Sequence, residues 1–326
     1  MLPDAPARVA DVFAPPAIEP VACAGDGPVL SGVDGPVLSK VEGPVLSGVE
    51  GPEPVPFLEI EPRSGLAALN LMEVWRYRDL LLVLASRDVK LRYKQTALGV
   101  VWVILQPLMA AGIFSFVFGK VLKAPSDGVP YFVFSFAGLL AYNAFSGTLT
   151  RASACIVGNA PLVSKIFFPR LILPLSTVLA TLIDFAVGMG LMIVLLCMSR
   201  IVPGWGILLL PVWLSLIIAL AVGIGLYTSA LMVQYRDLQY VIPVLINLVL
   251  YATPIMYSVS AIPPKLKIWV QLNPLTGLLE AFRWSLLGTK MPDWPAVAYS
   301  AIFVTVALVY GAFAFKKMER HFADVI

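Results

Sequence analysis

The sequence predicts an all-α integral membrane protein with six transmembrane helices, a basic amphipathic interface helix before them and a re-entrant helix pair between spans five and six. Three observations predict this class. Charged residues make up only 13% of the 326 residues, whereas an ordinary soluble domain has about 25%. Mean hydropathy is +0.86, and long apolar stretches recur after residue 97. This small number of charged residues could not cover the surface of a protein in water. Much of the surface must therefore face lipid.

Residues 1–62 differ in composition from the rest and are expected to form a disordered tail. They are rich in Pro, Gly and acidic residues, and an octapeptide recurs from Gly27, Gly35 and Gly43. A proline in every unit interrupts any helix, and each unit is too short to bury a core. A docking segment for a partner is the alternative. The first residues lack a basic stretch followed by an apolar one, so no cleavable signal peptide is expected. The transmembrane domain is therefore predicted over 63–326.

Residues 71–95 carry a basic amphipathic pattern. Apolar residues at helical spacing are Val74, Tyr77, Leu81 and Leu84, and the cations between them are Arg76, Arg78, Arg87, Lys90, Arg92 and Lys94. This pattern is typical of a helix that lies in the membrane interface among anionic headgroups. A surface helix of a soluble domain fits less well, because an apolar span follows directly.

Six apolar stretches are predicted to span the membrane. They cover 98–121, 131–149, 171–198, 207–233, 241–257 and 296–315. Most have the roughly 17–25 residues that a helical span needs. Asp184 is the one acidic residue inside a span. An intramembrane carboxylate is costly and therefore a functional candidate, but Asp184 could equally be hydrogen-bonded at a helix contact or lie near the bilayer edge.

Residues 262–290 are predicted to form the re-entrant pair. The stretch is fairly apolar but contains Pro274, Glu280 and Arg283. Two ionised groups near the centre of a span would cost about 2.5–3.5 kcal/mol each. Half-helices that enter the membrane and turn back, shielded by protein, are cheaper. With six full spans, both chain termini then lie on one side.

The distribution of Lys and Arg predicts which side this is. The terminal side has 13 cations, namely the six of the amphipathic helix with Arg151, Lys165, Arg170, Arg236, Lys316, Lys317 and Arg320. The opposite side has 7, namely Lys120, Lys123, Arg200, Lys265, Lys267, Arg283 and Lys290. Under the positive-inside rule both termini are cytoplasmic.

Catalytic and metal-binding motifs are missing from the sequence. There is no G-x-x-x-x-G-K-[ST] phosphate loop, no H-E-x-x-H and no G-x-S-x-G. Cys23, Cys155, Cys197 and His321 have no metal-ligand spacing. The sequence therefore favours a conduit over an enzyme, with no metal site.

Two loops on the predicted cytoplasmic side are candidates for contact with a soluble partner. Between spans two and three, Lys165 and Arg170 stand among phenylalanines and prolines, which fix a short helix or turn at the membrane surface. Between spans four and five, Arg236 and Asp237 are adjacent among aromatic residues. These charges are either positive-inside anchors or contact points through which a partner moves the spans.

Five segments, taken in order, carry a resemblance to a known family. They are RYKQTALGVVWVILQPLM (92–109), AGLLAYNAFSGTLTRAS with GNAPLV (137–163), KIFFPRLILPLS (165–176), YRDLQYVIPVLINLVLYATPIMYS (235–258) followed by IP and NPLTGLLEAFR, and the ending FADVI (322–326). Together these segments resemble the type-two ABC transporter (ABC-2) permeases that export polysaccharides such as O-antigen, capsule or teichoic-acid chains. Tyr142 stands where many members have Trp. The resemblance covers 69–326 and excludes the repeat-bearing tail.

The resemblance implies a transporter subunit of the cytoplasmic (inner) membrane, not an enzyme. Two permease chains would pair as a homodimer around a central pathway, in contact with membrane lipid and with no nucleic acid involved. Two separate ATP-binding subunits would dock on the cytoplasmic side and hold the ATP and Mg, so that this chain itself would carry no cofactor. The substrate would be a glycan linked to a polyprenyl lipid, as in lipopolysaccharide biosynthesis.

The resemblance also implies three sets of site residues. The residues expected to couple to the ATPase are Arg87, Lys165, Pro169, Arg170, Arg236 and Asp237. Aromatic faces stack on sugar rings, so the expected pathway residues are Trp102, Phe114, Tyr142, Asn143, Tyr251 and Tyr257. Packing and interface-belt roles are the alternative for these aromatics. The re-entrant gate is expected to contain Pro274, Glu280 and Arg283.

Other classes remain as alternatives. Within the same superfamily, the chain could export drugs or lipids, although the KIFFPR and FADVI segments favour glycan export. A membrane glycosyltransferase or polymerase would need an acid pair or a metal site facing the sugar. An ion-driven secondary transporter would show inverted repeats.

Overall fold

The computed structural model describes residues 75–94, 99–166, 168–319 and 322. Within these ranges the regular secondary structure consists of helices joined by loops, with no strand. The predicted tail over 1–62 lies outside the described residues. So do residues 71–74 and 95 of the predicted interface helix. The described part of that helix is α2, Arg78–Lys94.

Within the described ranges, five helical stretches are long and apolar enough to cross a membrane. They are Val101–Val121, Tyr131–Gly158, Ile172–Met198, Trp205–Gln234 and Trp294–Glu319. The first joins α3 (Gly99–Phe114) to a π-helical turn η2 (Ser115–Val121), and the fourth joins a 3₁₀ turn η3 (Trp205–Leu209) to α7 (Leu210–Gln234). The second, third and fifth are α4 (Tyr131–Gly158), α6 (Ile172–Met198) and α11 (Trp294–Glu319).

The fifth predicted span, 241–257, is not confirmed by length. The helix found there is α8, Leu238–Ala252, with 15 residues. At 1.5 Å per residue it is about 22 Å long, short of the roughly 30 Å of a bilayer's hydrocarbon core. The helix stops early because Pro254 follows Thr253, which adopts extended backbone angles, and a residue before proline disfavours the helical conformation.

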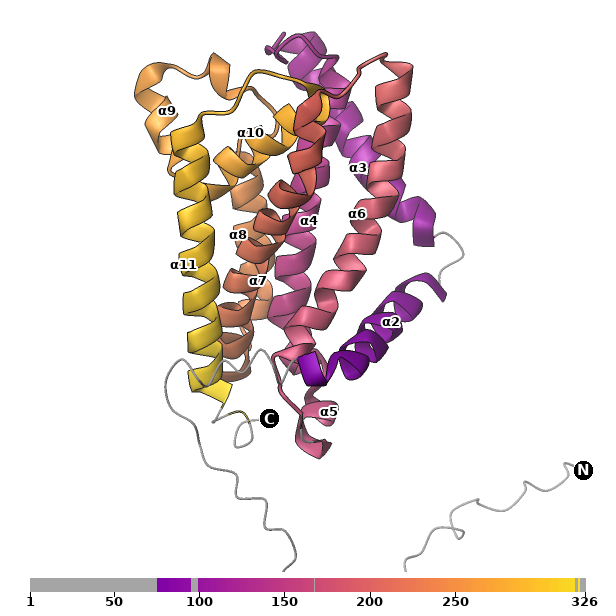
Figure 1. Cartoon of the computed structure of the whole chain (residues 1–326), viewed down its shortest axis with the longest axis vertical. Helices are drawn as coiled ribbons and strands as arrows, with labels where there is room; N and C mark the ends of the chain where they lie inside the picture. The colour runs from indigo at the N-terminus through magenta and orange to yellow at the C-terminus, as the bar shows by residue number, and fades with distance from the viewer. Residues whose placement is uncertain (1–74, 95–98, 167, 320–321, 323–326) are drawn as a thin grey trace, which may run out of the picture. The chain divides into compact units, whose positions relative to one another are not determined.

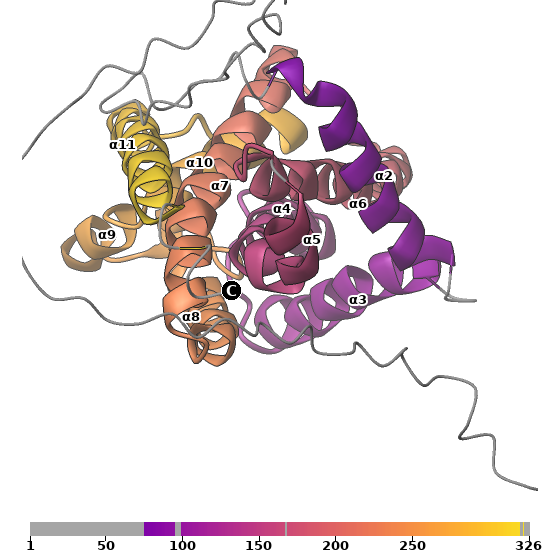
Figure 2. The ribbon, with the colours of Figure 1, turned by 90° about the horizontal axis from the view of Figure 1, so that it is seen from below.

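The bundle is built around α4, which packs against α6 on one side and α7 on another (Figures 1 and 2). Helix α7 packs in turn against α11. Glycines permit the closest crossings. A Cβ atom on Gly311 of α11 would lie 2.0 Å from the carbonyl oxygen of Gly223 on α7. Small residues at such crossings let membrane helices approach closely.

The buried side chains form two separate clusters. The larger cluster fills the bundle between α4, α6, α7, α10 and α11, with Phe136, Phe282 and Ile217 fully buried. The second cluster, here called the lower core, draws on α2, α4, α5 (Ala160–Lys165), α6, α7 and the last turns of α11, toward the end of the bundle at which α2 and α5 lie (Figure 1). It includes Leu84 of α2 and Val163 of α5.

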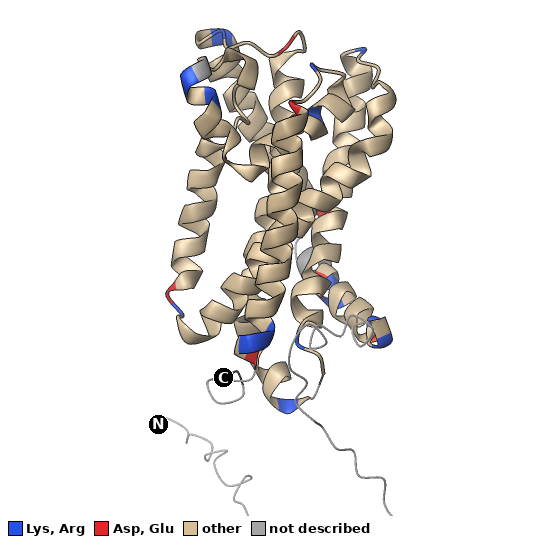
Figure 3. Ribbon diagram, turned by 60° about the vertical axis from the view of Figure 1, so that its left-hand side comes forward, with Lys and Arg blue, Asp and Glu red and all other residues tan. Residues whose placement is uncertain are grey.

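At the opposite end, the predicted re-entrant stretch contains two short helices, α9 (Pro264–Gln271) and α10 (Pro274–Leu287), after a 3₁₀ turn η4 (Val259–Ala261). Helix α10 packs against α4, α7 and α11 and is mostly buried, whereas α9 is mostly exposed. Gly288 ends α10 in the left-handed conformation, with φ of 65°, a position that favours glycine. Figure 3 shows Lys and Arg gathered toward the two ends of the bundle.

Candidate functional site

A polar groove lies between α4 and α8. Its lining residues are Ser146, Gly147, Thr150, Arg151, Pro243, Ile246 and Asn247, around a hollow of about 300 Å³. Thr150 and Asn247 are exposed. Hydroxyl, amide and guanidinium groups on membrane helices offer donors and acceptors to a polar ligand.

An ion pair within the bundle borders this groove. Arg151 Nη2 lies 2.5 Å from Asp184 Oδ2 on α6, and Arg151 Nη1 donates to Thr181 Oγ1 at 2.8 Å. The Arg151 side chain is 25% exposed and that of Asp184 is 16% exposed. The predicted second span ended at 149, but α4 continues to Gly158. Pairing with Asp184 satisfies the Arg151 charge within the bundle.

The predicted pathway residues divide by exposure. Trp102, Asn143 and Tyr251 are exposed, whereas Phe114 and Tyr257 are half-buried. Tyr142 is buried, and its hydroxyl donates to the carbonyl of Ile246, which joins α4 to α8. Tyr142 thus packs inside the single chain, about two helix turns from Thr150 of the groove.

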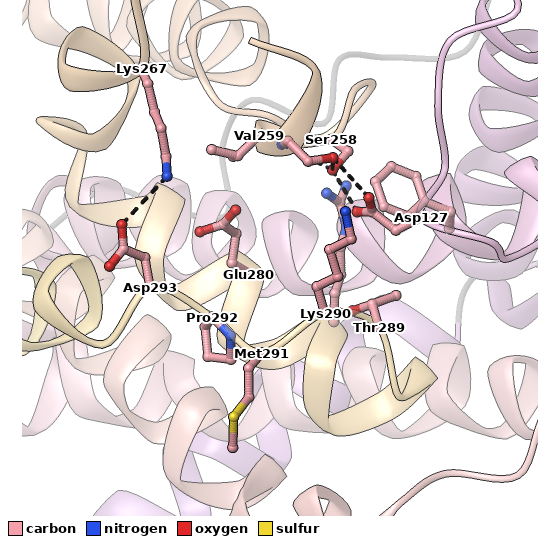
Figure 4. Close-up of a pocket in the computed structure, with 13 residues that line it drawn as sticks. Asp127, Ser258, Val259, Lys267, Glu280, Thr289, Lys290, Met291, Pro292 and Asp293 are labelled. Carbon is pink, nitrogen blue, oxygen red and sulfur yellow. Dashed lines mark hydrogen bonds and ion pairs between the residues drawn. The ribbon is translucent and has the colours of Figure 1, made fainter. Parts of the chain in front are cut away.

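A second pocket of about 340 Å³ lies at the end of the bundle that carries α9 and α10 (Figure 4). Asp127 accepts hydrogen bonds from Ser258 Oγ at 2.5 Å and Ser260 Oγ at 2.8 Å. Lys267 Nζ lies 3.6 Å from Asp293 Oδ2. Figure 4 shows Glu280 between these two groups. The predicted gate residue Glu280 therefore faces a charged pocket.

Arg283, the other charged gate residue, is buried at the base of this pocket. Its Nη1 donates to the Pro254 carbonyl at 2.7 Å and its Nη2 to the Ile255 carbonyl at 2.5 Å. Its guanidinium lies 4.0 Å from the ring centroid of Phe134. The Nε atom is buried with no acceptor among the described residues. Arg283 thus fixes the segment after α8 to α10 and α4.

Gly138 makes room for that guanidinium. A Cβ atom there would lie 2.2 Å from Arg283 Nη2. Pro274 is the first residue of α10, and the preceding Asn273 caps the helix, accepting the Leu275 backbone N–H at 3.1 Å. A proline at the first helical position and an Asn cap favour a helix start here.

The residues predicted to couple to an ATPase lie at the other end of the bundle. Arg87 Nη2 lies 2.8 Å from Asp88 Oδ1 and donates to Asn159 Oδ1 at 2.8 Å. Asn159 in turn donates to the Cys155 carbonyl at 2.8 Å. This chain of bonds connects α2 to the junction of α4 and α5.

The other coupling candidates differ in exposure. Lys165 is exposed at the end of α5, and Arg236 and Asp237 are exposed at the turn between α7 and α8. Pro169 and Arg170 are half-buried in the connection between α5 and α6. The sequence offered no sign of Asn159 or Thr181, whose roles come from pairing with arginines distant in the chain. Among the described residues, no three His, Cys, Asp or Glu side chains form a metal-binding group.

Comparison with known proteins identifies the class. The profile of the ABC-2 type transporter family matches residues 79–287. The chain belongs to this family, which confirms the resemblance inferred from its five segments.

Individual relatives narrow the comparison. The chain is 30% identical to the O-antigen export system permease protein RfbA of Myxococcus xanthus over 258 residues, which is 78% of this chain and 98% of the relative. It is 30% identical to the protein of the same name from Klebsiella pneumoniae, covering 76% of this chain and 95% of that one. It is 26% identical to the polysialic acid transport protein KpsM of Escherichia coli, over 72% of this chain and 91% of the relative.

Proposed function

We propose that this chain is the transmembrane subunit of an ATP-driven exporter that moves a lipid-linked polysaccharide across the cytoplasmic membrane. The observation that carries the proposal is the match to O-antigen export permeases over nearly their whole length. The absence of a phosphate loop from the sequence fits this function, because ATP and Mg would be held by a separate subunit.

The proposed membrane arrangement uses the helices described above. Helix α8 is the short fifth span and α11 the sixth, and α9 and α10 form the re-entrant pair at the outer end, with both termini cytoplasmic. Helix α2 lies in the cytoplasmic interface. The bonds of Arg283 to two backbone carbonyls support this arrangement, because a charge inside the membrane must be satisfied by protein.

The substrate pathway is proposed on the flank of the bundle that carries the groove between α4 and α8. Two chains would pair as a homodimer with these flanks facing each other. Asn143 of α4 and Tyr251 of α8 are exposed on the two helices that form the groove, Trp102 of α3 is exposed as well, and the groove adds the hydroxyl of Thr150 and the amide of Asn247. Aromatic faces with amides and hydroxyls suit a sugar polymer better than fixed charges do.

The coupling surface is proposed at the end of the bundle with α5. Lys165, Arg236 and Asp237 are exposed there and available to an ATP-binding subunit. Pro169 fixes the direction of the chain entering α6. Arg87 holds α5 in place through Asn159. At the outer end, Pro274, Glu280 and Arg283 would form the gate.

The test is reconstitution with an ATP-binding subunit of an ABC exporter from the same organism. We expect copurification as a complex of two permease and two ATP-binding chains, measured by native mass spectrometry. We also expect glycan export into the vesicle lumen to require ATP. Export driven by an ion gradient without an ATP-binding subunit would contradict the proposal. ATP-driven export of a drug or lipid, with no glycan export, would leave the family assignment intact and refute the substrate class.

A further inference from the structure

The connection between α5 and α6 is bonded to the end of α11, at the far end of the sequence. Arg170 Nη1 donates to the Glu319 carbonyl at 2.6 Å, and the Arg170 backbone N–H donates to Glu319 Oε1 at 3.4 Å. The Glu319 carboxylate is also paired with Lys316, whose Nζ lies 2.7 Å away. One arginine thus meets both the main chain and the side chain of the last residue of α11.

Phe322 completes this contact. Its side chain is only 1% exposed. Its ring meets Phe315 of α11 edge to face, with centroids 5.6 Å apart, and the Arg170 guanidinium lies 5.5 Å from its centroid. Phe168, two residues before Arg170, is buried in the same lower core as Phe322. We call Arg170, Phe315, Glu319 and Phe322 the C-terminal clamp.

The clamp occupies Arg170 inside its own chain. The guanidinium donates to a carbonyl and covers an aromatic face, both of them intramolecular contacts. Lys165 and Arg236, in contrast, are exposed at the same end of the bundle. The geometry therefore separates the coupling candidates into exposed groups that can meet a partner and one arginine that holds the chain in position.

We infer that the C-terminal clamp positions α5, so that force applied to α5 by an ATP-binding subunit is transmitted to α6 and α11. The clamp fixes the connection at Phe168 and Arg170, directly between α5 and α6. Without it, movement of α5 would be absorbed by the connection instead of by the spans. Arg170 and Phe322 act as positioning residues. This inference rests on the proposed function, because it concerns coupling to the ATPase.

The first test compares Phe322→Ala with Phe303→Ala in the full complex with its ATP-binding subunit. Phe303 is an exposed phenylalanine on α11, the helix that precedes Phe322, and serves as the matched control. We expect the Phe322→Ala protein to keep both its binding of the ATP-binding subunit and ATP hydrolysis. The amount of glycan exported per ATP should fall roughly two- to tenfold, the ratio that corresponds to the interaction energy of one buried aromatic pair. Phe322→Leu, which keeps an apolar side chain, should restore most of the coupling. Unchanged export per ATP in Phe322→Ala would overturn the inference.

The second test asks whether Arg170 acts through Phe322 or through the partner. If the clamp is one unit, Arg170→Ala with Phe322→Ala should be no worse than Arg170→Ala alone. Weakened binding of the ATP subunit in Arg170→Ala, but not in Phe322→Ala, would instead show that Arg170 contacts the partner directly, and would overturn its assignment to the clamp.

The third test does not depend on export. A nitroxide label at Ser164→Cys, exposed on α5, reports the mobility of this helix in an electron paramagnetic resonance spectrum. Cys23 and Cys197 are replaced by Ser, and buried Cys155 is retained. We expect the label to become more mobile with Phe322→Ala and not with Phe303→Ala. If the label is equally mobile in the Phe322→Ala and Phe303→Ala proteins, the clamp is refuted, even if the proposed function holds. Greater mobility with Phe322→Ala alone would support the clamp, even if the substrate assignment fails.

Discussion

Replacement of Arg283 by Met tests whether this residue holds together the end of the bundle that carries α9 and α10. Methionine has a similar length but cannot donate to the carbonyls of Pro254 and Ile255. A hydrogen bond from a charged donor contributes about 1.5–3 kcal/mol, so two lost bonds amount to about 3–6 kcal/mol. The contact with Phe134, 4.0 Å from the ring centroid, adds up to about 2 kcal/mol when desolvated.

Part of this loss is offset, because the variant no longer buries a charge. We therefore expect Arg283→Met to lower the free energy of unfolding by about 2–5 kcal/mol, with the carbonyls left unpaired as the main cause. The Arg283→Lys protein should have a free energy of unfolding between those of the wild type and of Arg283→Met, since one ammonium cannot reproduce the guanidinium fork. Lys290→Met, which removes an exposed cation from the same pocket, is the matched control.

The assay is thermal unfolding of the purified protein in detergent, followed by tryptophan fluorescence. Gly138→Ala gives an independent check, because its Cβ would lie 2.2 Å from Arg283 Nη2 and displace the guanidinium. In the Arg283→Met variant, the added Cβ atom would meet a flexible methionine side chain instead of the guanidinium. Gly138→Ala should therefore lower the stability of this variant less than it lowers that of the wild type. If Arg283→Met melts at the wild-type temperature, the role given to Arg283 is wrong.

Three further changes have defined outcomes. Asp184→Asn weakens the ion pair with Arg151 and should destabilise the protein by about 3–5 kcal/mol, measured by the same unfolding assay; wild-type stability would refute a structural role for the pair. Gly311→Ala should separate α7 from α11 and reduce the yield of folded protein, whereas Gly190→Ala, with no atom within 4 Å of its added Cβ, should not; equal yields would contradict the packing. Tyr251→Ala should lower glycan export without changing ATP-subunit binding, measured in proteoliposomes, and normal export would remove Tyr251 from the pathway.

The apolar stretches were sufficient to predict the helices but not their ends. Five of the six predicted spans correspond to helices long enough to cross a membrane. The second was predicted to end at 149, whereas α4 continues to Gly158. Arg151, within this extra length, pairs with Asp184, 33 residues further along the chain, and such pairing is not visible in sequence spacing.

The residues of the proposed gate and pathway were also only partly predictable from the sequence. Glu280 and Arg283 were recognisable as unusual because each charge is costly in an apolar stretch. The bonds that satisfy Arg283 come from backbone carbonyls of Pro254 and Ile255, and any residue type has such a carbonyl. Tyr142 was predicted to line a pathway, yet it is buried against α8. Residue type alone does not distinguish a lining aromatic from a packed one.

The two separate buried clusters have a consequence for how this chain can evolve. Arg283 contacts Phe134 and the carbonyls of Pro254 and Ile255, whereas Phe322 contacts Phe315 and Arg170, so these contacts share no residue. The free-energy effects of substitutions at distant sites without shared partners add. Changes that adapt the pocket beside α9 and α10 to a different polymer can therefore accumulate without disturbing the end proposed to meet the ATPase. The same coupling surface can then operate with different exported polymers.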